Sequence, residues 1–389
     1  MRVLFLAHSF PRHEGDAAGS FLLRLARGLE HEGIDVRVIA PASAGLAPSE
    51  RVDGVQVDRF RYAPRRFERL AYTGNMAQEV RDSWSARLTM VSFLGSEFVS
   101  AVRSGRRFHP DVVHAHWWFP GGLVGTWVAS LANVPLVTTL HGSDVRLLRG
   151  ASGARPAFRH VVRHSAAVTT VSHWLAQQVT SFAPGVSPMV APMPVDTDRF
   201  TPGGERSANR LLFVGRLNAQ KGVEHLIAAL ARMRVRATLD IVGDGPDREG
   251  LERQAMESGV ADRILWHGAL TQGDLPPLYR RAAALVVPSI EEGLGLVAVE
   301  AQLCGTPVVA SESGGLPDVV RHDHTGILVP PSNPEALARA LDDLLERPDA
   351  GRSLGEAGRV HALGTFAPES VARRYAMLYH TVLGHATAA

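Results

Sequence analysis

The sequence predicts an α/β protein with two Rossmann-like, doubly wound domains that face a central cleft. Three observations predict this class. Short β-rich runs alternate with helical stretches along the chain, which is typical of parallel sheets covered by helices on both faces. The 389 residues, 45% of them hydrophobic, exceed one ordinary domain core. The same alternation repeats on either side of a Pro- and Gly-rich stretch near residues 195–207, which is typical of a linker.

The first half begins with an apolar run, Val3–Ala7, that predicts a strand. A signal peptide is the alternative, but the run is short and a polar loop follows it without a small-residue cleavage pattern. Apolar residues at helical spacing predict a helix over Gly19–Glu32. Further strands are expected at Val36–Ala40, Asp111–His114, Leu136–Thr139 and Ala167–Val171.

The second half repeats the pattern. Strands are expected at Leu211–Val214, Thr238–Val242, Ile264–His267, Ala284–Val287 and Pro307–Ala310, with helices at Val223–Met233 and Pro334–Leu345. We expect an N-terminal domain over residues 1–195 and a C-terminal domain over 205–367, with the last helix, about 368–385, packed back on the first domain. Ligands of such sheets bind at the carboxyl ends of the strands, so the organisation predicts a cleft enzyme or a binding protein.

Charge and cysteine content exclude several classes of protein. The formal net charge is +2, and no basic face is wide enough to predict nucleic-acid binding. The single cysteine, Cys304, provides neither a disulfide nor a cysteine metal site, so we expect a reduced, cytoplasmic compartment. No run of about 18 apolar residues predicts a membrane span. A peripheral position at the inner face of the membrane stays open.

The segment VGRLNAQKG, Val214–Gly222, places two cations in a turn between a strand and a helix. A guanidinium and an ammonium at the end of a strand predict a diphosphate site formed by Arg216 and Lys221. Two solvated surface cations are the alternative. Lys221 is the only lysine in a chain with 41 basic residues, which favours a functional role.

The segment PSIEEGLGLVAVEAQLCGTPVVA carries two carboxylates eight residues apart. This spacing is a little over two helical turns, so we expect Glu292 and Glu300 to share a helix face. Between them, Gly293, Leu294 and Gly295 open a helix whose free N–H groups would bind phosphate. Glu300 lies in an apolar run and needs a hydrogen-bond partner, for which ribose hydroxyls are suitable. A structural Glu and a solvated Glu are the alternative.

Arg-x4-Lys followed by E-G-x-G-x4-E resembles the family 4 retaining glycosyltransferases of the GT-B fold, whose signature is E-x7-E. Other segments occur in the order expected for that family, so the resemblance covers almost the whole chain. These are DVVHAHW, PLVTTLHGSDV, PVDTDRF, DIVGDGPDREGLE, ILWHGAL, CGTPVVASESGGLPDVV and TGILVPPSNPEALA.

The resemblance implies a hexosyltransferase of cell-envelope or polysaccharide biosynthesis. It would move a sugar, with retention and without a metal or cofactor, from a UDP- or GDP-sugar to a glycan, lipid-linked or small-molecule acceptor. The second domain would bind the donor and the first the acceptor. Arg216 and Lys221 would stabilise the leaving diphosphate, Glu292 the sugar hydroxyls and Glu300 the ribose. His141 would reach the donor sugar from the first domain. Further donor contacts are implied for Gly243, Asp244, Gly245, Gly293, Leu294, Gly295, Leu296, Gly314 and Gly315.

The loop after the first strand departs from the family. That loop usually carries a Gly-Gly pair close to the donor phosphate, and in FPRHEGDAAGSF the pair falls near Asp16 and Ala17. We expect Gly15 and Gly19 to form the tight turn instead, with Gly15 near the donor. The change would mark an unusual acceptor.

Two segments of the first half have both an acceptor-binding and a structural interpretation. In HAHWWFPGG we expect His114 to be structural and His116, Trp117 and Trp118 to meet the acceptor, although core packing explains one Trp equally well. In Arg59–Tyr72, arginines interleave with aromatics. This segment suits an anionic membrane with a lipid-linked acceptor. A mobile, solvated acceptor loop is the interpretation we favour.

Two motifs and three rival functions are set aside. DTD, Asp196–Asp198, lies in PVDTDRF, which the resemblance implies is a hinge-side loop, and no other oxygen-ligand cluster suggests a required metal. GDGPDREG lacks the glycine spacing of a dinucleotide fingerprint, which disfavours a dehydrogenase. A nucleotide-sugar epimerase or hydrolase of the same fold would need extra acids or bases in the cleft. A non-catalytic partner subunit would not require Arg216, Lys221, Glu292 and Glu300.

Overall fold

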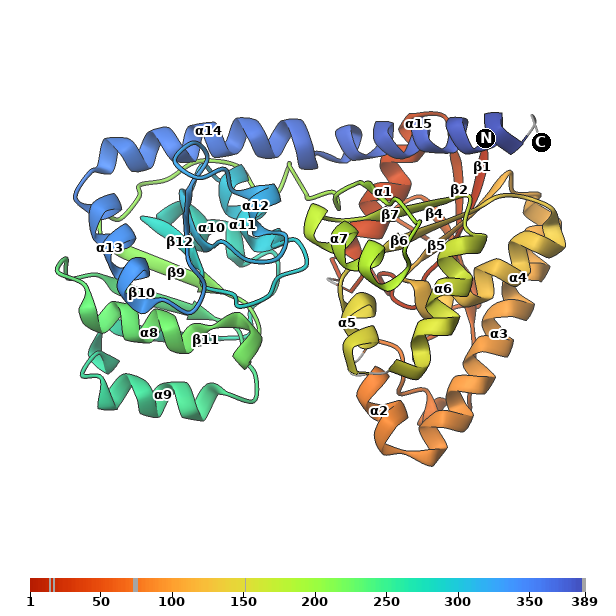
Figure 1. The fold of residues 1–389 in the computed structure, drawn as a ribbon, viewed down its shortest axis with the longest axis horizontal. Helices are drawn as coiled ribbons and strands as arrows, with labels where there is room; N and C mark the ends of the chain where they lie inside the picture. The colour runs from red at the N-terminus through yellow and green to blue at the C-terminus, as the bar shows by residue number, and fades with distance from the viewer. Residues whose placement is uncertain (14, 17, 73–75, 151, 387–389) are drawn as a thin grey trace. The chain divides into compact units, whose positions relative to one another are not determined.

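The computed structural model describes residues 1–389 except 14, 17, 73–75, 151 and 387–389. It divides into two compact units, each built on its own sheet (Figure 1). Unit 1 comprises Met1–Pro194 and Pro368–Ala389, and unit 2 comprises Val195–Ala367. Both sheets are parallel along almost their whole width and carry helices on both faces, so the predicted doubly wound α/β class is confirmed.

The elements of unit 1 alternate along the chain. They are β1 (Arg2–Leu6), α1 (Ser20–His31), β2 (Asp35–Pro41), β3 (Ser49–Val52), β4 (Val55–Phe60), α2 (Met76–Asp82), α3 (Trp84–Phe108), β5 (Val112–His116), α4 (Leu123–Ala132), β6 (Leu136–Leu140), α5 (Ser143–Gly150), α6 (Arg155–His164), β7 (Ala167–Thr170), α7 (His173–Phe182), β8 (Met189–Val190) and α15 (Pro368–Ala386).

The sheet of unit 1 has the order β3-β4-β2-β1-β5-β6-β7-β8 in the described residues. Within the described residues, every strand pairing of this sheet is parallel except that of β3 with β4, which form an antiparallel hairpin at one edge. The chain proceeds outward from β1 through β2 and β4, and then from β5 in the opposite direction. The neighbours β1 and β5 therefore flank the topological switch point, where doubly wound sheets bind ligands.

Alternate residues of β1 enter two different cores. Phe5 packs in the apolar cluster formed with α1 and α15, and Leu6 packs in the cluster formed with α3 and α4. Helix α15 lies beside α1 (Figure 1). A Cβ on Gly28 would come within 2.9 Å of the Ala372 Cβ atom, so α1 needs glycine there to let α15 approach. The last helix thus belongs to the core of unit 1.

Unit 2 repeats the pattern in fewer residues. Its elements are β9 (Arg210–Val214), α8 (Val223–Arg232), β10 (Thr238–Val242), α9 (Arg248–Glu257), β11 (Ile264–Gly268), α10 (Leu275–Arg281), β12 (Ala284–Val287), α11 (Leu296–Leu303), β13 (Val308–Ser311), α12 (Leu316–Val319), β14 (Ile327–Val329), α13 (Pro334–Leu345) and α14 (Pro348–Phe366).

The sheet of unit 2 has the order β11-β10-β9-β12-β13-β14. Buried residues of β9, β10 and β12 pack with α8, α9 and α13 in one continuous apolar cluster. Because the chain reverses its direction of travel between β9 and β12, the switch point of this sheet lies at their carboxyl ends. In the part of the chain that the structure describes, no helix of either unit is long and apolar enough to cross a membrane.

Candidate functional site

The two main sequence motifs meet at the switch point of unit 2. The loop after β9 (215–222) and the loop after β12 (288–295) contact each other directly. The Ile290 backbone N–H donates to the Gln220 carbonyl at 2.9 Å, and the Gln220 side chain donates to the Glu291 carbonyl at 2.8 Å. A Cβ on Gly222 would lie 2.2 Å from the Pro288 carbonyl oxygen, so only glycine permits this approach.

An ion pair at this edge joins the two motifs. Lys221 Nζ lies 2.5 Å from Glu292 Oε2, and the two side chains are 22% and 15% exposed. Ser289 Oγ donates to the same carboxylate oxygen at 3.4 Å. Arg216 is exposed at the end of β9 and forms no ion pair with any described residue. Lys221 is thus held by Glu292, while the Arg216 guanidinium, without a described carboxylate partner, can bind an anion directly.

The expectation that Glu292 and Glu300 share a helix face is wrong. Helix α11 begins at Leu296, after Gly295 in the left-handed conformation (φ 95°), so Glu292 lies in the preceding loop. Glu300 is one turn into α11 rather than two. The eight residues from Glu292 to Glu300 include a glycine turn before the helix begins. The spacing rule for residues on one helix face therefore does not apply to this pair.

Glu300 has protein partners. It is 4% exposed, Tyr279 donates its hydroxyl to Oε2 at 2.8 Å, and Gln272 approaches Oε1 at 3.5 Å. Burial, followed by the charge of Glu300, raises the pKa of Tyr279 well above its ordinary value, so the phenol keeps its proton and donates. The sequence predicted the need for a partner but did not identify Tyr279, because an aromatic in the amphipathic stretch of α10 is also what core packing would produce.

The loop after β10 packs tightly on the loop after β9. Leu217 donates its backbone N–H to the Asp244 carbonyl at 3.0 Å. Gly243 has φ +135°, and a Cβ there would lie 1.8 Å from the Gly215 carbonyl oxygen. At Gly245 a Cβ would lie 2.1 Å from the Leu217 oxygen. These glycines are thus required by the close approach of two loops, and they leave the Asp244 side chain exposed at the edge.

The loop after β13 completes the set around Glu292. Gly315 donates its N–H to the Glu292 carbonyl at 2.8 Å, and a Cβ on Gly314 would lie 2.1 Å from the same oxygen. A Cβ on Gly295 (φ +95°) would come within 2.7 Å of the Leu316 side chain, at the start of α12. The structure therefore gathers every predicted residue of unit 2 at the carboxyl edge of one sheet. These residues are Arg216, Lys221, Gly243, Asp244, Gly245, Glu292, Gly293, Leu294, Gly295, Leu296, Glu300, Gly314 and Gly315.

The carboxyl edge of unit 1 is lined by imidazole and indole rings. His116 Nδ1 lies 3.3 Å from His141 Nε2, and the Trp117 ring centroid is 4.6 Å from that of His141. His8, which follows β1, packs against Trp117 in a tilted arrangement with centroids 4.1 Å apart. The predicted residue His141 thus lies among rings that come from the ends of three different strands.

These imidazoles are held neutral. Burial lowers the pKa of His8 to about 4 and holds those of His116 and His141 well below their ordinary value, with neighbouring histidines adding to the effect for the last two. Within the described residues, His8 Nδ1, His116 Nε2 and His141 Nδ1 are buried atoms without a hydrogen-bond partner. Such atoms are uncommon in folded proteins, and polar groups of a ligand would satisfy them.

Asp144 positions the HGSD turn and was missed in the sequence. Its carboxylate accepts backbone N–H groups from Gly142 at 2.9 Å, His141 at 3.2 Å and Trp118 at 3.3 Å. Burial raises the pKa of Asp144 to about 6, and these donors oppose the rise. The available signal was an acidic residue in the first turn of α5, three residues after His141.

Two neighbouring aromatic residues are structural. His114 uses both ring nitrogens inside the core, Nδ1 with the Tyr379 hydroxyl at 2.6 Å and Nε2 with Thr139 Oγ1 at 2.7 Å. The expected structural role of His114 is therefore confirmed. Trp118 is 2% exposed and donates its indole N–H to the Asp144 carbonyl at 2.8 Å, so core packing explains it, and Trp117 is itself 7% exposed within the cluster of α1 and α15.

The altered loop after β1 is closed by an ion pair. Arg12 Nε lies 2.6 Å from Asp16 Oδ2, and although burial opposes ionisation, Arg12 and two backbone amides hold the pKa of Asp16 at about 2. Gly15 (φ +83°) and Gly19 (φ +70°) take the left-handed conformations expected of them. Ala17, the other residue at the position of the glycine pair, lies outside the described residues.

The favoured expectation of a solvated loop over Arg59–Tyr72 is wrong for several of its residues. Arg59 is 5% exposed, donates to the Pro11 carbonyl at 2.5 Å and forms an ion pair with Glu50 at 2.9 Å. Tyr62 and Leu70 are each 2% exposed. Arg59 therefore fastens β4 to the loop after β1. In DTD, Asp196 accepts the Arg199 backbone N–H at 2.9 Å, which is a local turn role.

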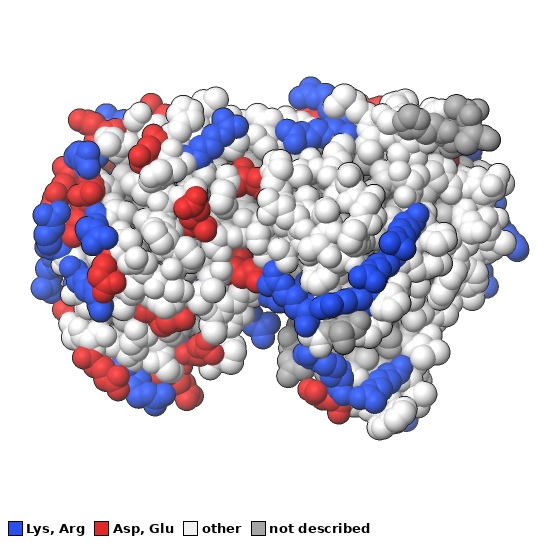
Figure 2. All heavy atoms as spheres, viewed as in Figure 1, with Lys and Arg blue, Asp and Glu red and all other residues white. Residues whose placement is uncertain are grey.

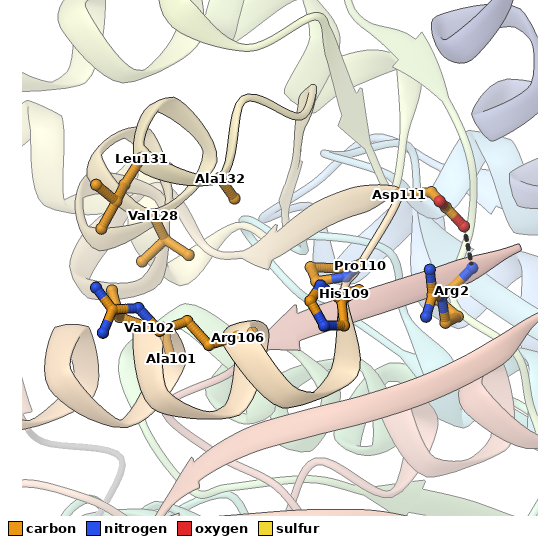
Figure 3. A pocket seen from close by; sticks show the side chains of 11 residues that line it. Arg2, Ala101, Val102, Arg106, His109, Pro110, Asp111, Val128, Leu131 and Ala132 are labelled. Atoms are coloured by element: carbon orange, nitrogen blue, oxygen red, sulfur yellow. Dashed lines mark hydrogen bonds between the residues drawn. The ribbon is translucent and has the colours of Figure 1, made fainter.

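A pocket in unit 1 lies at the amino ends of its strands, away from the switch point of the same sheet. Its volume is about 440 Å³, and its walls come from α3, α4 and the residues that precede β5. In Figure 3, Val128 and Leu131 lie opposite Val102, and Arg2 donates its backbone N–H to Asp111 at 2.7 Å. Arg2 and Asp111 mark the amino ends of β1 and β5. No predicted site residue lines this pocket, so its position does not suit the ligand of a doubly wound sheet.

Comparisons with known proteins agree with this geometry. Residues 195–361 match the glycosyl transferases group 1 model, and residues 17–192 match a glycosyl transferase 4-like domain. The chain is 34% identical to a D-inositol 3-phosphate glycosyltransferase of Salinispora tropica, over 89% of this chain and 77% of that protein. It is 31% identical to a glycogen synthase of Mycobacterium tuberculosis, over 97% of this chain and 94% of that protein.

Solved structures share the fold. A sucrose-phosphate synthase from Thermosynechococcus elongatus superposes with a TM-score of 0.81 at 23% identity, with 99% of each chain covered. Anabaena HepE in complex with UDP and glucose superposes with a TM-score of 0.72 at 20% identity, over 98% of this chain and all of that one. The matches to the family models and the relatives agree with the fold and with the motifs gathered at the edge of unit 2. The chain therefore belongs to the glycosyl transferases group 1 family, and it is a glycosyltransferase that takes its sugar from a nucleotide sugar.

Proposed function

We propose that the protein transfers a hexosyl group from a UDP- or GDP-sugar to a hydroxyl acceptor, with retention at the anomeric carbon and without a required metal ion. The observation that carries the proposal is the edge of unit 2. There Arg216, the Lys221–Glu292 ion pair and the N–H groups at the start of α11 gather at one switch point. Fixed cations and amides supply the stabilisation that a leaving diphosphate needs.

The ion pair suggests how donor binding would proceed. A diphosphate at this edge competes with Glu292 for Lys221, because its oxygens carry more negative charge than one carboxylate. Once Lys221 turns to the phosphate, the Glu292 carboxylate can accept hydrogen bonds from sugar hydroxyls. Arg216, exposed beside it, adds a planar fork to the same anion.

The reaction would then be a front-face exchange. The bond between the anomeric carbon and the diphosphate oxygen breaks, and the acceptor oxygen bonds to that carbon from the same side. The acceptor proton passes to the departing diphosphate, whose negative charge Arg216, Lys221 and the amides of α11 stabilise. We further propose that His141 contacts the donor sugar. Its support is the neutral imidazole with an unpartnered Nδ1 at the edge of unit 1.

Relatives support the substrate class. The names of three similar proteins specify a glycosyltransferase for D-inositol 3-phosphate, a glycogen synthase and an α-(1→4)-mannosyltransferase. Two proteins of similar fold were solved with UDP and glucose, and with ADP and acarbose. Transfer of a hexosyl group from a nucleoside-diphosphate sugar is consistent with the names of all five proteins.

The test is a donor screen followed by product analysis. Purified protein is heated with UDP-, GDP- and ADP-sugars, and a true donor raises Tm because it binds the folded state. Release of the nucleoside diphosphate is then measured with and without acceptor, in EDTA, and the anomer of the product is read by NMR. We expect acceptor-dependent release that EDTA does not slow, and a product with the donor's anomeric configuration. An inverted product refutes retention, and release without any acceptor favours a hydrolase or an epimerase.

A further inference from the structure

Unit 1 carries a stretch of chain without any acidic residue. Residues 145–195 contain no Asp or Glu, although the protein has 39 acids in 389 residues and about five would be expected there. The same stretch contains five arginines, all on α5 and α6, at positions 146, 149, 155, 159 and 163. The local positive charge is thus far above that of a chain whose net charge is +2.

The arginines of α6 form a row. Positions 155, 159 and 163 are spaced by four residues, so they lie one above the other on one helix face over about 12 Å. The opposite face of α6, with Phe158, Val161 and Val162, is buried. In Figure 2, basic side chains form a band across the face of unit 1 on which Figure 1 places α5 and α6.

The protein fixes this row in place. Arg159 donates Nε–H to the Phe182 carbonyl at 2.8 Å, and the Arg155 guanidinium lies 5.3 Å from the Phe182 ring centroid. Arg149 lies 5.3 Å from the centroid of Trp174. Within the described residues, no carboxylate pairs with Arg155, Arg159 or Arg163, and Arg155 Nε is a buried atom without a partner. The guanidinium groups of Arg155 and Arg159 are therefore oriented, and no described carboxylate neutralises them.

The chemistry of the row fits an extended anion. One phosphate spans too little to engage a row of about 12 Å. A bilayer surface usually also needs apolar side chains to insert, and large exposed hydrophobics are found elsewhere in unit 1, such as Trp84, Leu88 and Val91 on α3. Among the described residues of α5 and α6, no large hydrophobic side chain is exposed. The surface therefore suits a soluble chain with repeated charges.

The basic stretch that leads to the row begins beside the predicted site residue His141. Helix α5 starts at Ser143, two residues after His141, so the first arginines follow directly from the carboxyl edge of the sheet. A polymer whose end lies at that edge would extend along α5 and α6. This position suits an acceptor more than a ligand unrelated to transfer.

We propose that the acceptor is an acidic glycan whose carboxylate, phosphate or sulfate groups bind along the arginine row of α6. The inference rests on the proposed function, since it names the acceptor class of the same reaction. It assigns to Arg155, Arg159 and Arg163 the binding of acceptor repeats remote from the transferred sugar.

The test compares two double variants of equal charge. Arg159→Gln/Arg163→Gln removes two charges from the row, and Arg103→Gln/Arg107→Gln removes two exposed charges from α3 of the same unit. Binding of fluorescein-labelled hyaluronate oligosaccharide is measured by anisotropy, with neutral dextran and phosphatidylglycerol vesicles as further probes. We expect the row variant to weaken hyaluronate binding about tenfold, the loss of two partly solvated charge-assisted contacts, and the α3 variant to bind as wild type.

Other outcomes would overturn the proposal. Equal loss in both variants would show that only net charge matters, and equal binding of dextran would show that the acceptor's charge is irrelevant. Vesicle binding that exceeds hyaluronate binding would assign the row to a membrane. The single variant Arg163→Gln, at an exposed position of α6, shows whether a loss in the double variant comes from misfolding. The Tm shift by nucleotide-sugar should be unchanged in every variant, and its absence from wild type would count against the proposed function instead.

Discussion

The two sheets have the same strand order around their switch points, yet their carboxyl edges are chemically opposite. In unit 2 the edge carries the Lys221–Glu292 ion pair and the exposed Arg216, bordered by glycine turns. In unit 1 the corresponding edge carries His8, His116, Trp117 and His141, packed ring against ring with the imidazoles held neutral. One edge suits an anion, and the other suits rings and hydroxyl groups.

This difference teaches that topology gives the place of a site but not its chemistry. Both switch points follow from the winding of the chain. What each edge can bind depends on a few side chains that the winding does not dictate. A transferase with a charged donor and a hydroxyl acceptor needs both kinds of edge, and four experiments test whether the division holds.

The largest effect is expected from the charged edge. Lys221→Ala removes a cation that would stabilise the leaving diphosphate, so we expect kcat to fall about 10²–10³-fold. Arg232→Ala, which removes an exposed arginine of α8 in the same unit, is the matched control. Initial rates of nucleoside diphosphate release measure both. A Lys221→Ala rate within about threefold of wild type would remove the donor role from this edge.

The glycine turns of unit 2 give the next effect. Gly243→Ala forces a Cβ to 1.8 Å from a backbone oxygen at φ +135°, so we expect about 2–3 kcal/mol of destabilisation. Gly33→Ala has positive φ (+74°) but nothing within 4 Å, and about 1 kcal/mol is expected there. The free energies of unfolding of the two variants are compared in urea, with unfolding monitored by fluorescence. Equal losses would mean that the contact between the loops after β9 and β10 is not tight.

Glu97, a buried carboxyl group on α3 of unit 1, makes the stability of the protein depend on pH. This carboxyl is 0% exposed, both oxygens lack a partner among the described residues, and burial raises its pKa to about 8. The pKa of Glu97 is higher in the folded protein than in the unfolded chain, where it is about 4.5. The free energy of unfolding therefore has its full value below pH 4.5 and decreases as the pH rises to 8. Between pH 6.5 and 8 the loss should be about 2 kcal/mol. Glu97→Gln should abolish this decline in Tm, and an unchanged decline would place its origin elsewhere.

The smallest effect concerns His141. His141→Ala removes one neutral hydrogen-bonding group, so we expect a rate loss of about tenfold, close to the contribution of one such bond. His31→Ala, at an exposed position of α1, is the control. Because the pKa of His141 is held well below its ordinary value, kcat should show no His141 ionisation between pH 6 and 8. A titration near 6.5 that disappears in His141→Ala would contradict the neutral edge.

Much of the fold was predictable because its signals are local. Apolar runs such as Val3–Ala7 and Ala284–Val287 predicted strands that the structure has at Arg2–Leu6 and Ala284–Val287. The hairpin of β3 and β4 was not predicted, since Ser49–Val52 is a half-exposed edge strand with little apolar pattern. Helix α3 was also missed, because its exposed Leu88 and Val91 blur the helical periodicity.

The site was predictable where the motif supplies both the residue and its place. Arg216, Lys221 and the glycines lie directly at strand ends, so spacing was enough. Supporting residues were not predictable from spacing, because Tyr279 and Arg59 act on partners far away in the sequence, and Asp144 also accepts from the distant Trp118. The shared helix face of Glu292 and Glu300 failed for another reason, namely that a positive φ at Gly295 starts the helix later than the pattern suggests.

The single lysine has a practical consequence for chemistry in solution. Apart from any N-terminal amine, Lys221 is the only primary amine in the chain, and its side chain is 22% exposed. Acylating reagents would therefore modify one internal position. Intact-mass spectrometry would detect the modification of Lys221 as a single increase in mass. A nucleotide that binds at the edge of unit 2 would protect Lys221 from acylation. The extent of protection would therefore measure nucleotide binding without an acceptor, a labelled ligand or turnover.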